Sequence, residues 1–96
     1  MTVTRTIVEN NSLPSLPRHV KMRFDQRRGR WIVLAPERVL MPDEVAVEIL
    51  KLCDGATSVS TIVEKLAKIY DASAEEIGED VAEMLQDMAD KGFVQL

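Results

Sequence analysis

The sequence predicts an α+β domain in which strands precede helices. Apolar and polar residues alternate in the first half of the chain, and apolar residues recur at helical spacing in the second half. A segment bracketed by prolines, 36–43, separates the two patterns. With 96 residues, 46% of them hydrophobic and 29% charged, the chain has the size and composition of one folded domain.

The first half predicts three antiparallel strands. Every second residue between positions 20 and 24 is apolar, which is the period of a half-buried strand that begins near His19. Gly29 supplies the positive φ of a short hairpin turn. The returning strand, 30–35, is apolar on both faces, as in a strand that is central in its sheet or covered by another chain. A shorter third strand, 39–41, is expected at the edge of the sheet.

Three helices are predicted in the second half, each with a polar residue at its N-cap. The N-cap candidates are Asp43, then Thr57 or Ser58, and finally Ser73, and Gly92 ends the third helix. The last two helices are joined by a short turn. A three-stranded antiparallel sheet followed by three helices in this arrangement predicts a winged helix-turn-helix domain.

The domain is expected to span residues 18–96. Residues 1–17 show no periodic pattern and contain Pro14 and Pro17, so we predict a flexible N-terminal arm or linker there. We see no signal peptide and no apolar run of the roughly 18 residues that a membrane helix needs. A cytoplasmic protein is therefore expected, without membrane attachment.

The catalytic inventory is thin, which predicts a protein that is not an enzyme and needs no cofactor or metal. The one histidine, His19, has no second ligand or carboxylate at a useful spacing. The one cysteine, Cys53, lies on the apolar face of the first predicted helix, where a thiol is usually a small core residue. The four glycines are scattered, so no phosphate-binding loop is present.

Charge is distributed unevenly along the chain, although the net charge is only −4. Residues 1–38 hold eight Lys or Arg against three acids, giving +5, and residues 39–96 hold four Lys against thirteen acids, giving −9. The third predicted helix carries seven acids against Lys91, a net of −6, and would repel DNA. A nucleic-acid binder using the basic hairpin with Arg27, Arg28 and Arg30 therefore stays as the alternative function.

Recognition of a peptide fits the residues better than catalysis or DNA binding. An apolar edge strand at 39–41 offers main-chain groups to which an extended peptide can add. The third helix brings Met84, Leu85 and Met88, which suit an adaptable groove, although apolar residues at helical spacing are more often core. The doubly apolar strand at 31–34 leaves a homodimer open as a third interpretation.

The chain also resembles the PqqD family of pyrroloquinoline quinone (PQQ) biosynthesis proteins. The most specific elements of the resemblance are Leu34-Ala35-Pro36-Glu37-Arg38-Val39-Leu40 and Cys53-Asp54-Gly55. Further matching positions are Ile49-Leu50, Ile62-Val63, Leu66-Ala67, Tyr70, Asp80-Val81, Met84-Leu85 and Lys91-Gly92. The similarity runs from about Pro17 to the C-terminus, and in some members this module is fused to the family's C-type oxidase.

The resemblance implies a winged helix-turn-helix peptide chaperone that is not an enzyme. Such proteins bind the precursor peptide PqqA and present it to the radical S-adenosylmethionine (SAM) enzyme PqqE. Related recognition elements hold their leader peptide as an added strand between the third strand and the third helix. The residues that this implies for a peptide groove are Arg38, Val39, Leu40 and Met41 on the strand and Asp80, Val81, Met84, Leu85 and Met88 on the helix. On charge alone, we expect Lys21, Arg23 and Arg30 to dock the modifying enzyme.

Overall fold

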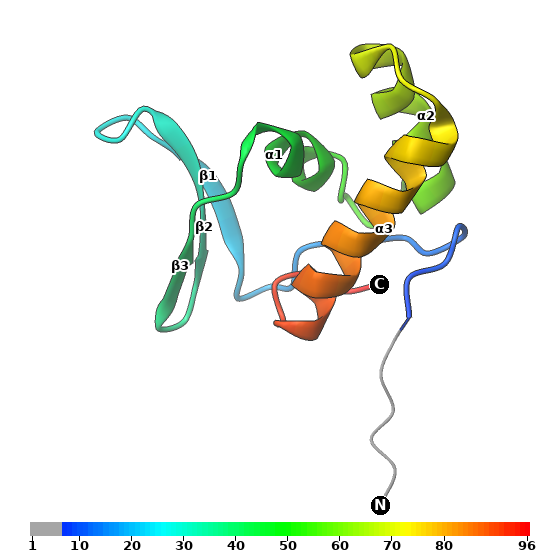
Figure 1. The fold of residues 1–96 in the computed structure, drawn as a ribbon. Helices are drawn as coiled ribbons and strands as arrows, with labels where there is room; N and C mark the ends of the chain where they lie inside the picture. The colour runs from blue at the N-terminus through cyan, green and yellow to red at the C-terminus, as the bar shows by residue number, and fades with distance from the viewer. Residues whose placement is uncertain (1–6) are drawn as a thin grey trace, which may run out of the picture.

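A computed structural model describes residues 7–96 and shows a small antiparallel sheet with three helices on one side of it (Figure 1). The strands are β1 (Lys21–Asp25), β2 (Arg30–Ala35) and β3 (Arg38–Leu40), in the spatial order β1-β2-β3. The helices α1 (Glu44–Lys51), α2 (Val59–Tyr70) and α3 (Ala74–Asp90) follow. This order confirms the predicted α+β fold with three antiparallel strands before three helices.

The β1–β2 hairpin forms as the alternating pattern predicts. Met22 pairs with Val33 and Phe24 with Trp31, which places these four side chains on one face of the sheet. Gly29 has the predicted positive φ, 65°. The Asp25 carboxylate accepts hydrogen bonds from main-chain N–H groups within the turn and so stabilises it.

Strand β2, which is apolar on both faces, is the central strand of the sheet. This was one of the two explanations that its sequence allowed. Val33, on the face toward the helices, and Ile32, on the outer face, are both buried. A two-residue turn, Pro36–Glu37, leads from β2 into β3, and Glu37 adopts a left-handed backbone with φ of 62°.

Each helix begins at a predicted cap. The side chain of Asp43 accepts a hydrogen bond from the N–H of Ala46 at 2.8 Å. Ser58 accepts in the same way from the N–H of Thr61 at 3.2 Å, and Ser73 from the N–H of Glu76 at 3.1 Å. These caps satisfy N–H groups that would otherwise lack a partner in the first helical turn.

One core lies between the inner face of the sheet and the three helices. The apolar stripe of α3 enters it through Val81, Leu85 and Met88. The chain then turns at Gly92, and Phe93 and Val94 return to the same core. No helix among the described residues is long and apolar enough to cross a membrane.

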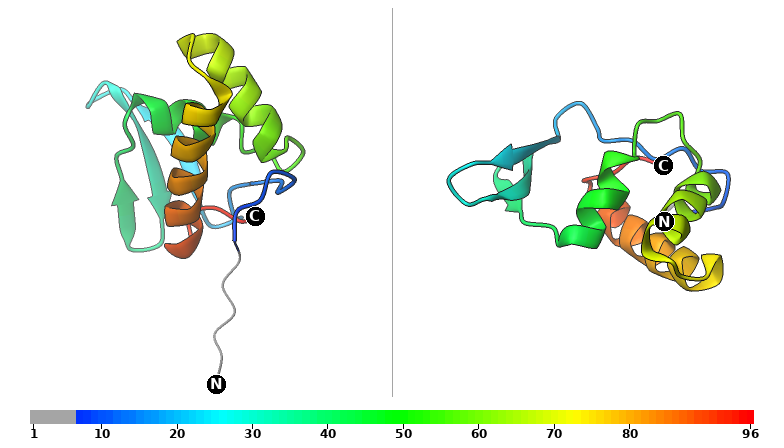
Figure 2. Two further views of the ribbon diagram at one scale, coloured as in Figure 1. Left: turned by 45° about the vertical axis from the view of Figure 1, so that its right-hand side comes forward. Right: turned by 90° about the horizontal axis from the view of Figure 1, so that it is seen from above.

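Residues 1–6 of the predicted N-terminal arm lie outside the described residues, and 7–17 pack beside the helices (Figure 2). The N–H groups of Val59 and Ser60, in the first turn of α2, donate to the carbonyls of Ser12 and Asn10, both at 3.0 Å. Pro14 is fully buried. Part of the predicted arm is therefore held to the domain by hydrogen bonds and burial.

Candidate functional site

The third strand lies at one edge of the sheet and, among residues 7–96, pairs only with β2. A two-residue turn joins β2 and β3, so Ala35 and Arg38 form the hydrogen-bonded pair beside it. Pairs alternate along an antiparallel ladder, which makes Leu34 and Val39 a pair without mutual hydrogen bonds. The N–H and C=O of Val39 therefore point away from β2, toward the open edge.

Side chains along β3 and the residue after it alternate between the two faces of the sheet. Leu40 pairs with Val33 on the inner face and packs against the core. Val39, on the outer face, is 56% exposed, and Met41 is 46% exposed. The edge of β3 thus offers apolar side chains next to its outward-pointing main-chain groups, which is the combination that an added strand uses.

Arg38 connects the beginning of β3 with the segment that follows α3. Its guanidinium carbon lies 4.4 Å from the centre of the Phe93 ring, a cation–π contact. A Cβ atom built on Gly92 would lie 3.7 Å from its Nη2 atom. A cation in this place is also favoured by the negative end of the α3 dipole. Arg38 therefore marks one end of the predicted groove.

The five α3 residues predicted for the groove divide into two groups. Val81, Leu85 and Met88 are buried in the core. Met84 is half-buried and packs against that core, and Asp80 is exposed. A surface hollow of about 530 Å³ runs along this side of α3, lined by Asp80, Glu83, Met84, Gln86, Asp87 and Asp90. The exposed side of α3 is therefore acidic around Met84, and the three buried residues anchor the opposite side of the helix in the core.

The three cations predicted to dock an enzyme do not share one role. Lys21 pairs with Leu34 and Arg23 with Ile32, so both cations lie on the outer face, and both are exposed. Arg30 is engaged within the chain, because its Nη2 donates to the carbonyl oxygens of Met41 and Pro42, both at 3.2 Å. Arg30 therefore holds the connection between β3 and α1 in place.

The groups most often used in catalysis are poorly placed for it. Burial, with a smaller contribution from the neighbouring charge of Asp54, raises the pKa of the Cys53 thiol to about 12, so the thiol stays neutral. His19 is exposed. Within residues 7–96 no group of three or more His, Cys, Asp or Glu side chains is placed to hold a metal ion.

Sequence reasoning missed a second surface feature, an aromatic hollow between the β1–β2 hairpin and the helices. It encloses about 820 Å³ and is lined by Phe24, Trp31 and Tyr70, among others. Phe24 and Trp31 are cross-strand partners. The predicted hairpin, with its turn ending at Gly29, could have indicated this pairing from the sequence. Nothing in the sequence pattern brings Tyr70 to them.

The sequence matches the family described as "Coenzyme PQQ synthesis protein D (PqqD)" over residues 30–94, from β2 to the C-terminal tail. The chain belongs to the PqqD family. A "PqqA binding protein" of Rhodopseudomonas palustris strain BisB5 is 63% identical over 87 residues, covering 91% of this chain and 85% of that relative. The PqqD resemblance seen in the sequence is thereby confirmed.

Solved structures agree with this family. The PqqD part of Methylobacterium extorquens PqqCD, described as a functional and stand-alone recognition element for ribosomally synthesized and post-translationally modified peptides (RiPPs), superposes with a TM-score of 0.81. It is 40% identical and covers 95% of this chain and 97% of its own. Lasso peptide synthetase B1 complexed with its leader peptide has a TM-score of 0.76 at 13% identity, covering 88% of this chain and 100% of that chain, and therefore shows the fold alone.

The PqqD relatives are named for binding and recognition. This agrees with the prediction that the chain is not itself an enzyme.

Proposed function

We propose that this chain is a non-catalytic peptide chaperone in PQQ synthesis that binds the precursor peptide PqqA as an added strand on β3. The observation that carries the proposal is the open edge of β3, where the main-chain groups of Val39 point outward beside exposed apolar side chains. The relatives that are named as PqqA binding proteins support the identity of the peptide.

The peptide strand would lie between β3 and α3. The peptide side chains on the inner face would contact Met84. Beneath them lie the core residues Val81, Leu85 and Met88, against which Leu40 also packs. The peptide side chains on the outer face would lie beside Val39 and Met41. The acidic surface of α3 favours a peptide that carries a cation near Asp80, since opposite charges steer the encounter.

A proline substitution on the open edge tests this arrangement. Val39→Pro removes the N–H that would pair with the peptide and leaves the β2–β3 hydrogen bonds, since that N–H points away from β2. We expect the affinity for synthetic PqqA, measured by calorimetry, to fall about three- to tenfold, because one net hydrogen bond contributes about 0.5–1.5 kcal/mol. Val39→Ala keeps the N–H and is the matched control, with an expected loss below about threefold.

Two outcomes would contradict the proposal. Equal affinity of the proline variant and wild type would remove strand addition on β3 from consideration. Binding of DNA in place of PqqA, with an affinity that collapses as salt is raised, would favour the alternative of a nucleic-acid binder using the Arg27–Arg30 turn. Apolar strand addition depends far less on salt.

The remaining part of the proposal is that the bound peptide is presented to the radical SAM enzyme PqqE. The exposed cations Lys21 and Arg23, on the outer face of the sheet, are the proposed contacts for an acidic surface of that enzyme. Arg30 supports this face from its position on the β3–α1 connection. Ile32 and Val33 of the central strand β2 are buried within this one chain, so the doubly apolar strand does not by itself require a second copy, and the homodimer stays a prediction.

A further inference from the structure

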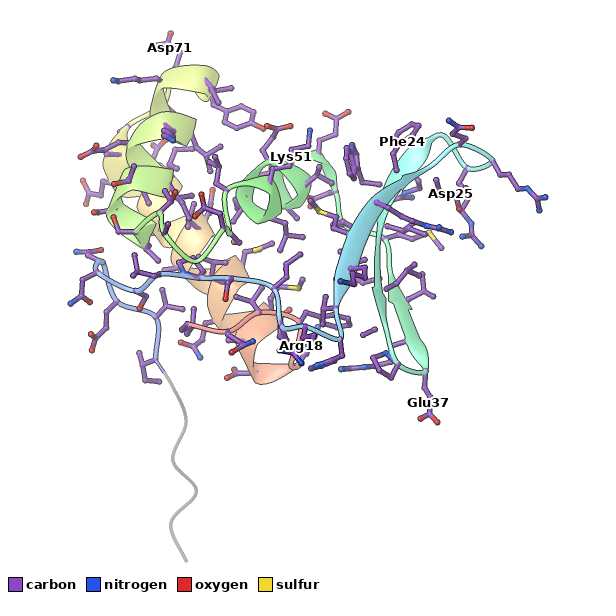
Figure 3. The ribbon with its side chains drawn as sticks, turned by 180° about the vertical axis from the view of Figure 1, so that it is seen from behind. Arg18, Phe24, Asp25, Glu37, Lys51 and Asp71 are labelled. Atoms are coloured by element: carbon purple, nitrogen blue, oxygen red, sulfur yellow. The ribbon has the colours of Figure 1, made fainter. Side chains whose placement is uncertain are left out.

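The aromatic hollow is formed by three segments that are distant in the sequence. Phe24 and Trp31 come from the β1–β2 hairpin, Val47 from α1, and Ile69 and Tyr70 from the end of α2. Figure 3 shows Phe24 on the hairpin and Lys51 on the neighbouring α1, the two elements that border the hollow. At about 820 Å³ it is larger than the 530 Å³ hollow along α3.

Aromatic side chains are concentrated here although the core lies close by. The chain has four aromatic residues, and three of them line this hollow while only Phe93 is buried in the core. Phe24 is 48% exposed, Tyr70 40% and Ile69 62%. Large exposed apolar side chains gathered in one place mark interaction surfaces, and aromatic residues dominate the binding energy of interfaces.

The floor of the hollow is held in a fixed geometry. The rings of Phe24 and Trp31 meet edge to face, with 5.8 Å between their centres and an interplanar angle of 72°. Lys51 places its Nζ 4.9 Å from the centre of the Trp31 ring and forms an ion pair with Glu48 at 3.4 Å. A surface ordered in this way loses little side-chain entropy when a partner binds.

The rim of the hollow has an excess of negative charge. Asp43, Glu44 and Glu48 stand against two cations, and both cations are engaged within the chain. Arg30 bonds to the β3–α1 connection, and Lys51 contacts Trp31 and Glu48. Glu44 is exposed and forms no ion pair with any residue in 7–96. A partner that complements this rim carries a Lys or Arg next to a large apolar side chain.

We infer that this hollow docks the modifying enzyme, through an enzyme surface that presents an apolar side chain beside a Lys or Arg. The inference rests on the proposed function and adds the surface of contact. No residue of β3 or α3 lines the hollow, so it does not overlap the proposed peptide groove. The peptide and the enzyme can therefore bind at the same time. The enzyme contacts both faces of the β1–β2 hairpin, the face with Phe24 and Trp31 and the face with Lys21 and Arg23.

The test compares variants of the hollow with matched variants elsewhere. The full-length chain, saturated with synthetic PqqA, is titrated with PqqE by biolayer interferometry. We expect Phe24→Ser combined with Ile69→Ser to weaken the binding of the enzyme at least about tenfold, as for the removal of a hot spot, and to leave the affinity for the peptide unchanged. Leu13→Ser is the control, since Leu13 is an apolar residue 47% exposed outside the hollow.

A second pair of variants tests the charge of the rim without altering the apolar floor. Glu44→Lys is expected to weaken binding of the enzyme at least about threefold. Glu64→Lys, an equal change of charge at an exposed position on α2 outside the hollow, should not. Glu44 is exposed, so we expect Glu44→Lys to fold. This variant therefore tests the hollow even if the Phe24→Ser, Ile69→Ser double variant does not fold.

Each negative result has a separate meaning. Absence of PqqA binding by the wild-type chain overturns the proposed function itself. Binding of the peptide without binding of the enzyme overturns presentation and, with it, this inference. If the enzyme binds the hollow variants as tightly as wild type, or only Lys21→Glu and Arg23→Glu weaken it, the hollow is not the docking site and the peptide proposal stands.

Discussion

At the scale of single residues, two positions other than glycine within residues 7–96 have a left-handed backbone. Glu37 has φ of 62° in the turn between β2 and β3, and Asp71 has φ of 49° at the end of α2. The left-handed conformation costs an L-residue roughly 1–2 kcal/mol, a cost that is smaller for Asn and Asp and that Gly does not bear. The turn before β3, the edge proposed to bind the peptide, therefore contains a strained residue, Glu37, after a proline that fixes its own φ.

Asp71 offers a direct measurement of such strain. Its N–H donates to the carbonyl of Ala67 and closes α2, while its carboxylate lies at the negative end of the helix dipole. We expect Asp71→Gly to raise the free energy of unfolding by about 0.5–1 kcal/mol, measured by urea denaturation. Asp71→Asn removes only the charge and should give a smaller gain. A loss of stability in Asp71→Gly would contradict this explanation.

At the scale of elements, the sequence predicts the strands and helices well because their signals are local. Alternation defines β1, and a polar cap begins each helix. The division of α3 was harder to predict, since a stripe of apolar residues looks alike whether it faces a core or a groove. Of the five α3 residues predicted for the groove, Val81, Leu85 and Met88 lie in the core, and Met84 and Asp80 reach the surface.

Two further features could not be predicted from local patterns. The aromatic hollow needs Tyr70 beside a hairpin that lies about forty residues earlier in the chain. Residues 7–17 are attached through main-chain carbonyls, such as those of Asn10 and Ser12, and main-chain bonds leave no trace in residue identity.

The turn between α1 and α2 depends on the ionised form of Asp54. Its carboxylate accepts hydrogen bonds from the N–H of Ala56 at 2.9 Å, and from the hydroxyl and N–H of Thr57 at 3.0 and 2.8 Å, which lower its pKa below the ordinary value of 3.8. The folded chain therefore binds a proton at Asp54 less readily than the unfolded chain. The contribution of Asp54 to stability is therefore complete well above pH 3.8, and it is lost as the pH falls from there through the lower pKa of the folded chain.

A comparison of acid unfolding checks this dependence. We expect the midpoint urea concentration of wild type to fall more steeply between pH 5 and pH 2 than that of Asp54→Asn, which retains an acceptor but does not titrate. Parallel curves for the two proteins would show that the turn does not depend on the charge.

At the scale of the whole molecule, the uneven charge of the chain becomes a difference between surfaces. The cations of the first 38 residues lie largely on the sheet and its hairpin, whereas α3 carries seven acids. The acidic helix borders the proposed peptide groove, and the basic sheet face lies on the hairpin side. Surfaces of opposite charge attract partners, or parts of one partner, of opposite charge.

Residues 8–12 are hydrogen-bonded to the helices, which extends the folded unit beyond its predicted N-terminal boundary. The sequence predicts a domain from residue 18, but carbonyls of residues 10 and 12 accept the N–H groups of Ser60 and Val59, and the N–H of Val8 donates to Gln86 Oε1 at 2.9 Å. A chain that starts at Leu13 lacks all three bonds. We expect it to lose about 1–3 kcal/mol of unfolding free energy in urea and to bind PqqA as before, since β3 and α3 are intact. Stability within 0.5 kcal/mol of wild type would instead establish residues 1–12 as an arm independent of the domain.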